Sequence, residues 1–464
     1  MTAGGARLAA QRLGAWAARL GPGPILLAGW LAFLIYAYPG YMSSDSIDQL
    51  LDARIGTFND WHSPTMTELW RWVGLAISGP FGMLALQSLL LLGGGYALAA
   101  RRLPPRTAAL VASGALVFPP VMSTMAVIWQ DSQMAGFLLA GLAAITSRRR
   151  GMLACGLGLF VLASAMRPSA PIAVLPLLVL GLAARGERPV SWRRHAVAVV
   201  AWAAVWLAAV GLDAGLRSTA TGHARTELAI ADLIGTLRYA GRLDDAAVRA
   251  LVPDLALRGA DLQARASVDN ARRRDPTDGP DRLFEPPASA ADRDALLAAQ
   301  HRLAAARPRA YLLHRWHILY RVLGAQTLPG EKPVYTEFAG SAAQADAAVH
   351  LAQHSAVQGA AIAVVEALAR TPLFWPFVYA AIAVALLVLA ARRRQAVPAA
   401  LAASGLAYEL SLFVVAPTSS YALSHWMIAS TTLAGALIAV AAVRAWRDSA
   451  RVAPALASHP PEPG

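Results

Sequence analysis

The chain has 464 residues, of which 56% are apolar and only 15% are charged. A soluble protein of average composition carries about 25% charged residues, so this chain holds more apolar side chains than one soluble core can bury. The composition also excludes a disordered chain, which is poor in apolar residues, and the single cysteine excludes a disulfide-stapled domain. A polytopic membrane protein is the class that remains, and its net charge of +13 then requires an explanation.

Ten apolar runs predict membrane-spanning helices, because a span requires roughly 20 mostly apolar residues. The first run ends at Tyr38-Pro39-Gly40 without a small-residue cleavage site, which favours a retained helix over a signal peptide. The predicted spans are 22–39, 81–100, 107–128, 133–147, 151–166, 169–184, 196–213, 372–391, 397–416 and 425–443. The sequence therefore predicts an all-α, polytopic transmembrane bundle of about ten spans.

The arginines alternate between the two sides of this predicted bundle. With the N-terminus inside, the inside segments hold nineteen basic and three acidic residues, whereas the short outside segments hold only Arg54, Arg71 and Arg167 as basic residues. Short cytoplasmic loops carry such an excess of Lys and Arg. The positive charge is therefore interpreted as an orientation signal, and no nucleic-acid partner is expected.

A long polar region over 214–371 interrupts the series of spans on the outside. Its flanks, about 225–265 and 290–323, show the apolar periodicity of helices, so a small helical extracytoplasmic domain is expected there. The predicted organisation is an N-terminal transmembrane bundle with its first outer loop over 1–213, this domain over 214–371, a C-terminal transmembrane bundle over 372–447 and a disordered cytoplasmic tail over 448–464.

Ionisable residues gather at the predicted outer surface. A helix capped by Ser43 or Ser44 is expected to place four polar residues on one face. These residues are Asp45, Asp48, Gln49 and Asp52. Crowded carboxylates repel each other, so one of them has a raised pKa or faces a cation, and the alternative is a solvated face. The same surface carries Trp129-Gln-Asp131, Arg167-Pro-Ser169 and Pro417-Thr-Ser-Ser-Tyr421-Ala-Leu-Ser-His425.

Two stretches of the long outside region also place ionisable residues in an apolar setting. Asp232 lies within an otherwise apolar helix, and residues 308–321 form a basic, aromatic, amphipathic helix that includes His314 and Arg315. Such a helix can lie along a membrane surface and meet lipid phosphates. A solvated helix that packs on the bundle is the alternative.

In their order along the chain, these elements resemble a GT-C-type membrane glycosyltransferase, a superfamily that uses polyprenyl-phosphate-linked sugars. The run Ser44-Asp45-Ser-Ile-Asp-Gln49, followed by Gly56 and Asp60-Trp61-His62-Ser-Pro64, is similar to bacterial members of undefined substrate. Further similar elements are Trp129-Gln-Asp131, Arg167-Pro-Ser169, Asp232-Leu, Tyr311-Leu-Leu-His-Arg315, Tyr408-Glu409-Leu and Ser424-His425-Trp-Met. The chain departs from the family where His62-Ser63-Pro64 replaces His-Pro-Pro and where Ser420-Tyr421-Ala422-Leu423 replaces Asp-Tyr-Arg-Tyr.

The resemblance implies a GT-C-like fold in the bacterial inner membrane, with a catalytic first outer loop that faces the periplasm. It implies inverting transfer of a hexosyl or pentosyl group from a polyprenyl-phosphate donor to a glycan, lipid or protein acceptor, with Asp45 as the general base. The residues expected to support Asp45 or to bind the sugar are Asp48, Gln49, Asp60, His62 and Asp131. Those expected to bind the lipid phosphate are Arg167, His314, Arg315, Tyr421 and His425. The sequence leaves open whether Asp45, Asp48 or Asp131 hold a divalent cation such as Mg²⁺ or Mn²⁺.

Two other functions fit the same composition. A flippase or transporter of lipid-linked glycans requires ionisable residues near the bilayer midplane, where Glu409 is the main candidate, with Asp213 near the end of a span. A glycan polymerase or ligase would act through His314 and Arg315 rather than through Asp45. Substitution of Asp45, compared with substitution of Arg315, distinguishes the transferase from the polymerase.

Overall fold

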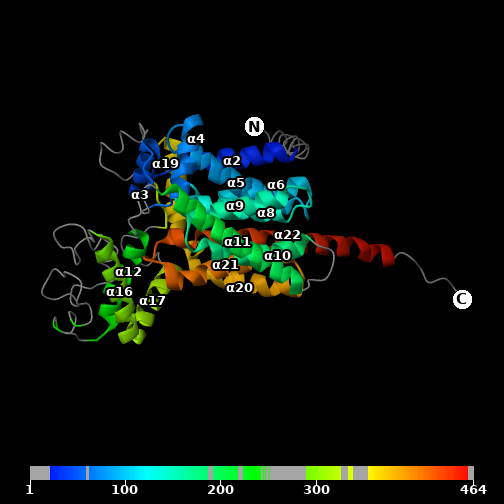
Figure 1. Ribbon diagram of the computed structural model, residues 1–464. Coiled ribbons are helices and arrows are strands. Elements are labelled where there is room, and N and C mark those ends of the chain that lie inside the picture. The colour runs from blue at the N-terminus through cyan, green and yellow to red at the C-terminus, as the bar shows by residue number, and fades with distance from the viewer. Residues whose placement is uncertain are drawn as a thin grey trace.

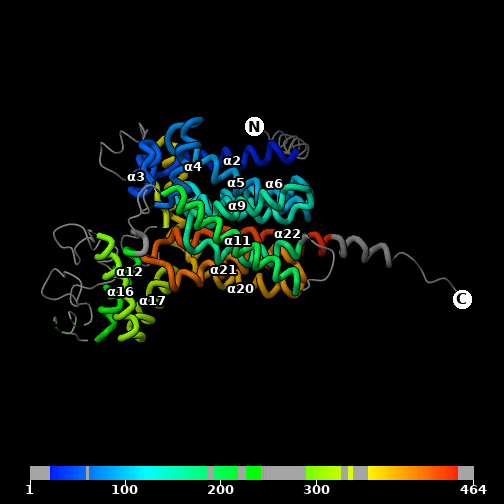
Figure 2. Tube along the Cα trace, in the orientation of Figure 1, coloured from blue at the N-terminus to red at the C-terminus, as the bar shows by residue number. Residues whose placement is uncertain are grey.

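The computed structural model describes residues 21–58, 62–185, 192–217, 223–241, 289–324, 333–337 and 354–457, together with residues 244, 246 and 250. Within these residues the chain is helical, and the only β-type pairing is an isolated parallel bridge between Tyr41 and Val127. Most helices pack side by side into one bundle, with a smaller group of helices at one end (Figures 1 and 2). The all-α prediction is confirmed for this part of the chain.

Each predicted span coincides with a helix or, in one case, with a pair of helices. These are α2 (Pro22–Ala37), α5 (Phe81–Ala99), α6 (Pro105–Val117) with α7 (Pro119–Met125), α8 (Gln130–Ile145), α9 (Met152–Met166), α10 (Ala170–Arg185), α11 (Trp192–Leu216), α20 (Pro376–Arg392), α21 (Ala396–Val415) and α22 (His425–Ala457).

Length and hydropathy separate these helices into two groups. Four segments, α5, α11, α21 and Tyr421–Arg447, are long and apolar enough to cross a membrane, and α6 with α7, bent by 66°, raises the number to five. The remaining five helices at predicted spans have 15 to 17 residues, fewer than the roughly 20 that the hydrocarbon core requires. The four to five apolar helices indicate a membrane protein, and the count of ten spans stays a prediction.

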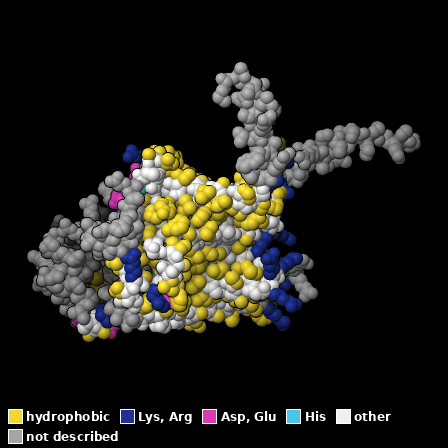
Figure 3. Space-filling model, turned by 90° about the horizontal axis from the view of Figure 1, so that it is seen from above, with side chains coloured by type: hydrophobic (Ala, Val, Ile, Leu, Met, Phe, Trp, Pro, Cys, Tyr) yellow, Lys and Arg dark blue, Asp and Glu magenta, His cyan; other side chains and the backbone are white. Residues whose placement is uncertain are grey.

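The side of the bundle is apolar, as expected for helices that face lipid rather than water. Leu110 on α6, Leu207 on α11 and Leu410 on α21 are among the large apolar side chains that lie exposed there. Figure 3 shows hydrophobic side chains over the face that it presents, with arginines gathered at one end. This surface supports the assignment of the bundle to a membrane.

The two ends of the bundle differ in charge. One end, here called the arginine end, carries exposed arginines in the connections α5–α6, α8–α9 and α20–α21 and in the helix turns beside them (Figure 3). They are Arg101, Arg102, Arg106, Arg148, Arg149, Arg150, Arg392, Arg393 and Arg394. The other end, here called the polar end, carries α3 (Ser44–Ile55), α4 (Pro64–Ala76), α12 (His223–Tyr239), α16 (Ala290–Ala306), α17 (Pro308–Leu323) and α19 (Ala356–Ala369) (Figure 1).

The structure differs from the prediction in two places, one at the polar end and one at the C-terminus. Helices α12, α16 and α17 lie in the expected helical flanks and pack on one another, but α19 is an apolar helix where the sequence predicted only a polar domain. Gln358 of α19 donates hydrogen bonds to the carbonyls of Tyr36 (3.1 Å) and Tyr38 (2.7 Å), which attach α19 to the end of α2. At the C-terminus, α22 continues through Ala457 into the tail predicted to be disordered, because alanine and arginine favour helix.

Candidate functional site

The candidate site is built on α3 at the polar end. The Oγ of Ser43 accepts a hydrogen bond from the backbone N–H of Ser46, and the Oγ of Ser46 accepts one from the backbone N–H of Ser43, both at 3.3 Å. This reciprocal capping satisfies two N–H groups that a helix start leaves without partners. The predicted helix with a Ser43 cap is confirmed, and Asp45 lies in its first turn, where the helix dipole favours a carboxylate.

Only part of the polar face of α3 is exposed. Asp45 and Asp48 are exposed, whereas Gln49 is buried. The Nε2 of Gln49 donates to the carbonyl of Ser63 and to the Oγ1 of Thr67, both at 3.3 Å. Gln49 therefore ties α3 to the start of α4 and positions the helix, so the prediction that it binds sugar does not fit this geometry.

The loop between α7 and α8 fixes the first turn of α3. The Nε1 of Trp129 donates to the Oγ of Ser43 (3.0 Å), and the Oγ of Ser46 donates to the carbonyl of Ile128 (2.7 Å). The backbone N–H of Ile128 donates in turn to the carbonyl of Tyr41 (2.9 Å). These bonds hold the N-terminus of α3 against the chain that leads into Asp131.

A buried ion pair lies at the same end. Asp131, in the first turn of α8, accepts a hydrogen bond from the Nε of Arg167 at 3.1 Å on one carboxylate oxygen and pairs with the Nη2 of Arg167 through the other. The hydroxyl of Tyr408 on α21 donates to Asp131 at 3.3 Å. The Arg167 side chain is 29% exposed, and its Nη1 makes no hydrogen bond within the described residues. One edge of this guanidinium is therefore free to meet an anion.

Asp45 lies within electrostatic range of this ion pair and of His62. The negative charge of its carboxylate favours the protonated forms of Arg167, on which Asp131 has the larger effect, and of His62. Four of the predicted site residues, Asp45, His62, Asp131 and Arg167, are thus brought to one end of the bundle from three separate segments of the chain. The sequence predicted that these residues share one surface. The structure shows in addition that Asp131 and Arg167 form an ion pair.

His62 lies just before α4 and is only 7% exposed. Its Nε2 has no hydrogen-bond partner within the described residues. Burial lowers the pKa of His62 below its ordinary value, against the opposing effect of Asp45, Asp52 and Asp48, which raise it. The imidazole is therefore neutral near pH 7.

We expect the protein to lose stability as the pH falls below about 6.5. Burial favours neutral His62 in the folded protein, whereas the unfolded chain takes up a proton as the pH falls through the ordinary histidine pKa. The folded state is thus favoured above that pH and progressively less below it. Thermal unfolding in detergent at about pH 7.5 and about pH 5.5 measures the loss, and His62→Gln should make it smaller. The same loss in the variant would assign the effect to other groups.

Arg315 lies in a different setting from the one predicted. Its guanidinium is fully buried and donates to the carbonyls of Phe413 (2.6 Å), Ala416 (2.9 Å) and Leu412 (3.2 Å) and to the Oδ1 of Asp232 (3.0 Å). These carbonyls belong to the C-terminal end of α21, so Arg315 caps that helix. The predicted role of Arg315 as a phosphate ligand does not fit this geometry, whereas a structural role for Asp232 does.

The other residues predicted to bind phosphate are buried as well. His314 lies with its Nε2 3.3 Å from the Oδ1 of Asp232, and Tyr421 and His425 belong to a segment that packs inside the polar end. Tyr421 and His425 were expected at an outer surface because they flank a predicted span, and His314 because it belongs to an amphipathic stretch, but all three side chains are buried. Of the predicted phosphate ligands, Arg167 alone combines partial exposure with a position near Asp45.

Gly235 on α12 makes room for His314. A Cβ atom at position 235 would overlap the imidazole ring of His314, so Gly235→Ala is expected to separate α12 from α17 and to cost about 1–3 kcal/mol of folding free energy. Gly359→Ala on α19 is the control, because nothing lies within 4 Å of a Cβ there and alanine favours helix. Thermal unfolding of both variants measures the difference, and equal midpoints would contradict the packing argument.

A metal site at Asp45, Asp48 or Asp131 finds no support in the described residues. No group of three His, Cys, Asp or Glu side chains converges there to hold an ion. Asp131 is committed to Arg167 instead. Asp60, predicted to support the site, lies outside the residues that the structure describes.

One residue beside the site was missed at the level of sequence. The hydroxyl of Tyr335 donates to the carbonyl of Met42 (3.2 Å), and its ring lies 5.6 Å from that of Trp129. Tyr335 belongs to the long outside region, and no motif or periodicity around it indicates a contact with the first outer loop. It ties that region to the loop that carries α3.

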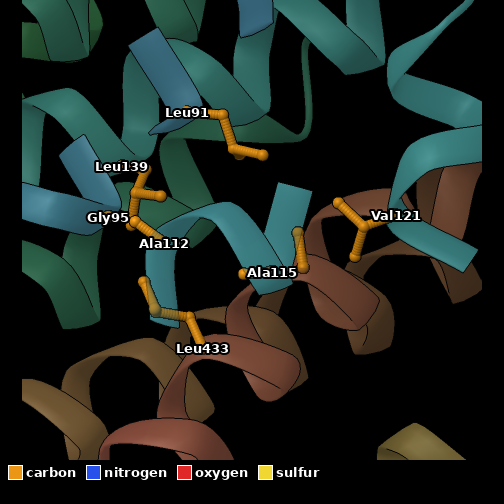
Figure 4. Close-up of a pocket in the computed structure, with 8 residues that line it drawn as sticks. Leu91, Gly95, Ala112, Ala115, Val121, Leu139 and Leu433 are labelled. Atoms are coloured by element: carbon orange, nitrogen blue, oxygen red, sulfur yellow. The ribbon is translucent and has the colours of Figure 1, made fainter. Parts of the chain in front are cut away.

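A small cavity lies within the bundle between α5, α6, α7, α8 and α22 (Figure 4). It is lined by Leu91, Gly95, Ala112, Ala115, Val121, Leu139, Ala429 and Leu433. None of these side chains can donate or accept a proton, so the cavity is not a candidate active site.

Comparison of the chain with protein-family models, with curated proteins and with solved structures finds no match in any of the three. The candidate site therefore stands on its geometry. It consists of an exposed carboxylate, Asp45, a partly exposed guanidinium, Arg167, and a buried imidazole, His62, which lie at the polar end of an apolar helical bundle.

Proposed function

We propose that the protein is an integral-membrane glycosyltransferase of the GT-C type. It would move a sugar from a polyprenyl-phosphate donor to an acceptor on a glycan, lipid or protein. The observation that carries the proposal is that exposed Asp45 and partly exposed Arg167 lie at the same end of an apolar bundle. A lipid-linked sugar keeps its chain in the membrane and its phosphate at the surface, so a site for it requires both a base and a cation at that level.

We infer that the arginine end faces the cytoplasm, because short cytoplasmic loops carry the Lys and Arg excess. The polar end then faces the outside of the bacterial inner membrane, with about ten helices spanning it. In this orientation α3 meets lipid-linked donors on the periplasmic side. The exposed arginines of three connections on one end support this assignment.

In the proposed reaction Asp45 takes the proton of the acceptor hydroxyl as its oxygen attacks C1 of the sugar. The bond between C1 and the phosphate oxygen breaks, the configuration at C1 inverts, and the lipid phosphate leaves with its negative charge. The uncommitted edge of Arg167 stabilises that charge, since a guanidinium matches phosphate oxygens. Asp131 fixes Arg167 through their two-point contact, and Tyr408 in turn holds Asp131.

Membranes that contain the protein, supplied with a labelled polyprenyl-phosphate sugar, test this proposal directly. Appearance of label in an acceptor that depends on the wild-type chain supports it. Absence of transfer across the common hexosyl and pentosyl donors would overturn it.

One observation favours a second function, a flippase or transporter of lipid-linked glycans. Glu409 is buried in α21, accepts a hydrogen bond from the Oγ of Ser424 (2.8 Å), and its Oε2 has no partner within the described residues. Buried carboxylates in membrane helices mark proton or substrate pathways in transporters. This function would be favoured if Glu409→Gln no longer moved lipid-linked sugars across the membrane while Asp45→Asn still did. A polymerase acting through His314 and Arg315 gains no support, because both are buried.

A further inference from the structure

Helix α17 has two contrasting faces. One face is buried and includes His314, Arg315 and Ile318. The other exposes four large side chains that form an apolar and aromatic stripe. These side chains are Leu312 (53% exposed), Leu313 (43%), Trp316 (60%) and Tyr320 (66%). At 3.6 residues per turn they lie within about 100° of arc on the helix.

The buried face fixes the rotation of α17, so the stripe cannot turn inward. Arg315 holds the helix to Asp232 on one side and to the last carbonyls of α21 on the other. His314 packs directly on Gly235 of α12, because glycine has no side chain that would separate the imidazole from that helix. Rotation of the stripe toward the protein would break the buried ion pair, so the stripe is a fixed part of the surface.

The stripe lies at the level where the apolar side of the bundle ends. Helix α17 lies beside the polar ends of α20 and α21 (Figure 1). In the last two turns of α21, Leu410 and Val414 are exposed as well. The apolar surface that indicates a membrane around the bundle thus extends onto α17 at the level where the bundle ends.

We propose that the stripe of α17 lies in the boundary between lipid headgroups and acyl chains at the polar end. Tryptophan and tyrosine are enriched at that depth because their rings are apolar at one edge and polar at another. Exposed Arg309 falls within the same arc, where its charge meets lipid phosphates. Helix α17 is then an anchor that holds α12 and α16 against the membrane, whatever reaction the site carries out.

Spin labels on the full-length protein in phospholipid vesicles test this inference. The only cysteine, Cys155, is replaced by serine, and labels are attached in Leu313→Cys and Tyr320→Cys. Ala291→Cys on α16, exposed and next to Asp292, serves as the water reference, and Leu410→Cys on α21 as the lipid reference. Oxygen, which concentrates in lipid, and a water-soluble nickel complex are the two relaxing agents.

At positions 313 and 320 we expect oxygen to relax the labels more than the nickel complex does. The ratio of the oxygen effect to the nickel effect should lie between the ratios at the two reference positions. Labels as open to nickel as the one at position 291 would show the stripe to be in water and would overturn the inference. Labels shielded from both agents would also overturn it, since another part of the chain or a second copy would then cover the stripe. Because each substitution is at an exposed position, the fold is expected to tolerate all of them.

Discussion

The Asp45→Asn variant is expected to lose glycosyl transfer by about 10²–10⁴-fold, the usual contribution of a general base, while it folds like the wild type. Asparagine keeps the shape of the side chain but cannot take up the acceptor proton. The contacts that hold α3 use Ser43, Ser46 and Gln49 rather than Asp45. Loss of the negative charge near the helix start costs at most about 1 kcal/mol.

The matched control is Glu366→Gln, which makes the same chemical change at an exposed carboxylate of α19, also at the polar end. Transfer of labelled sugar by membranes is compared per amount of inserted protein. The thermal unfolding midpoint of each variant is measured to show that it folds like the wild type. Glu366→Gln should retain wild-type transfer. Near-normal transfer by Asp45→Asn would remove Asp45 as the base, and equal losses in both variants would point to a general effect of surface charge.

The positions of the bundle helices could be predicted from sequence because a membrane sets the length of an apolar run. The run 81–100 corresponds to α5 (Phe81–Ala99), and 397–416 to α21 (Ala396–Val415). The run 107–128 shows the limit of hydropathy alone. It is broken into α6 and α7 at Pro119 and Pro120, which lack the N–H groups that a continuous helix requires, so this signal was present in the sequence.

The candidate site was predictable in part. The Ser43 cap and the position of Asp45 follow from local sequence, because a cap involves residues three apart. The pairing of Asp131 with Arg167 could not follow, since it depends on how α8 and α9 pack. The order of the predicted spans and the alternation of arginine-rich loops indicated that both would lie at one surface, but not that they would share two hydrogen bonds.

Arg315 shows where the same reasoning fails. The stretch 308–321 is basic on more than one face, and sequence alone does not say which face meets the protein. The partners of Arg315 are Asp232 and the carbonyls at the end of α21, far away along the chain. A buried arginine and a phosphate-binding arginine therefore look alike until tertiary packing is known.

The Asp232→Ala variant is expected to lose about 3–5 kcal/mol of folding free energy, because it leaves the Arg315 guanidinium buried without a counterion. Asp232 accepts hydrogen bonds from Arg315 at 3.0 Å and from Gln300 of α16 at 3.2 Å, so it joins α12, α16 and α17. Arg315 then joins this group to α21 through three carbonyls. Removal of one carboxylate thus weakens both the packing of the three helices and their attachment to the bundle.

Gln300→Ala is the control, because it removes a partly buried, uncharged partner of the same carboxylate and leaves the ion pair in place. The expected loss of folding free energy in this control is about 1.5–3 kcal/mol, the contribution of a hydrogen bond to a charged group. Thermal and denaturant unfolding in detergent measure both variants, and limited proteolysis reports whether α12, α16 and α17 detach. Any loss of transfer in Asp232→Ala should scale with the loss of folded protein, since Asp232 touches no reacting group in the proposed mechanism. A loss of stability no larger than that of Gln300→Ala would show that Arg315 is held by the α21 carbonyls alone. Loss of activity in a fully folded Asp232→Ala protein would instead contradict the structural role of Asp232 and favour the polymerase hypothesis, in which its partners His314 and Arg315 act in the reaction.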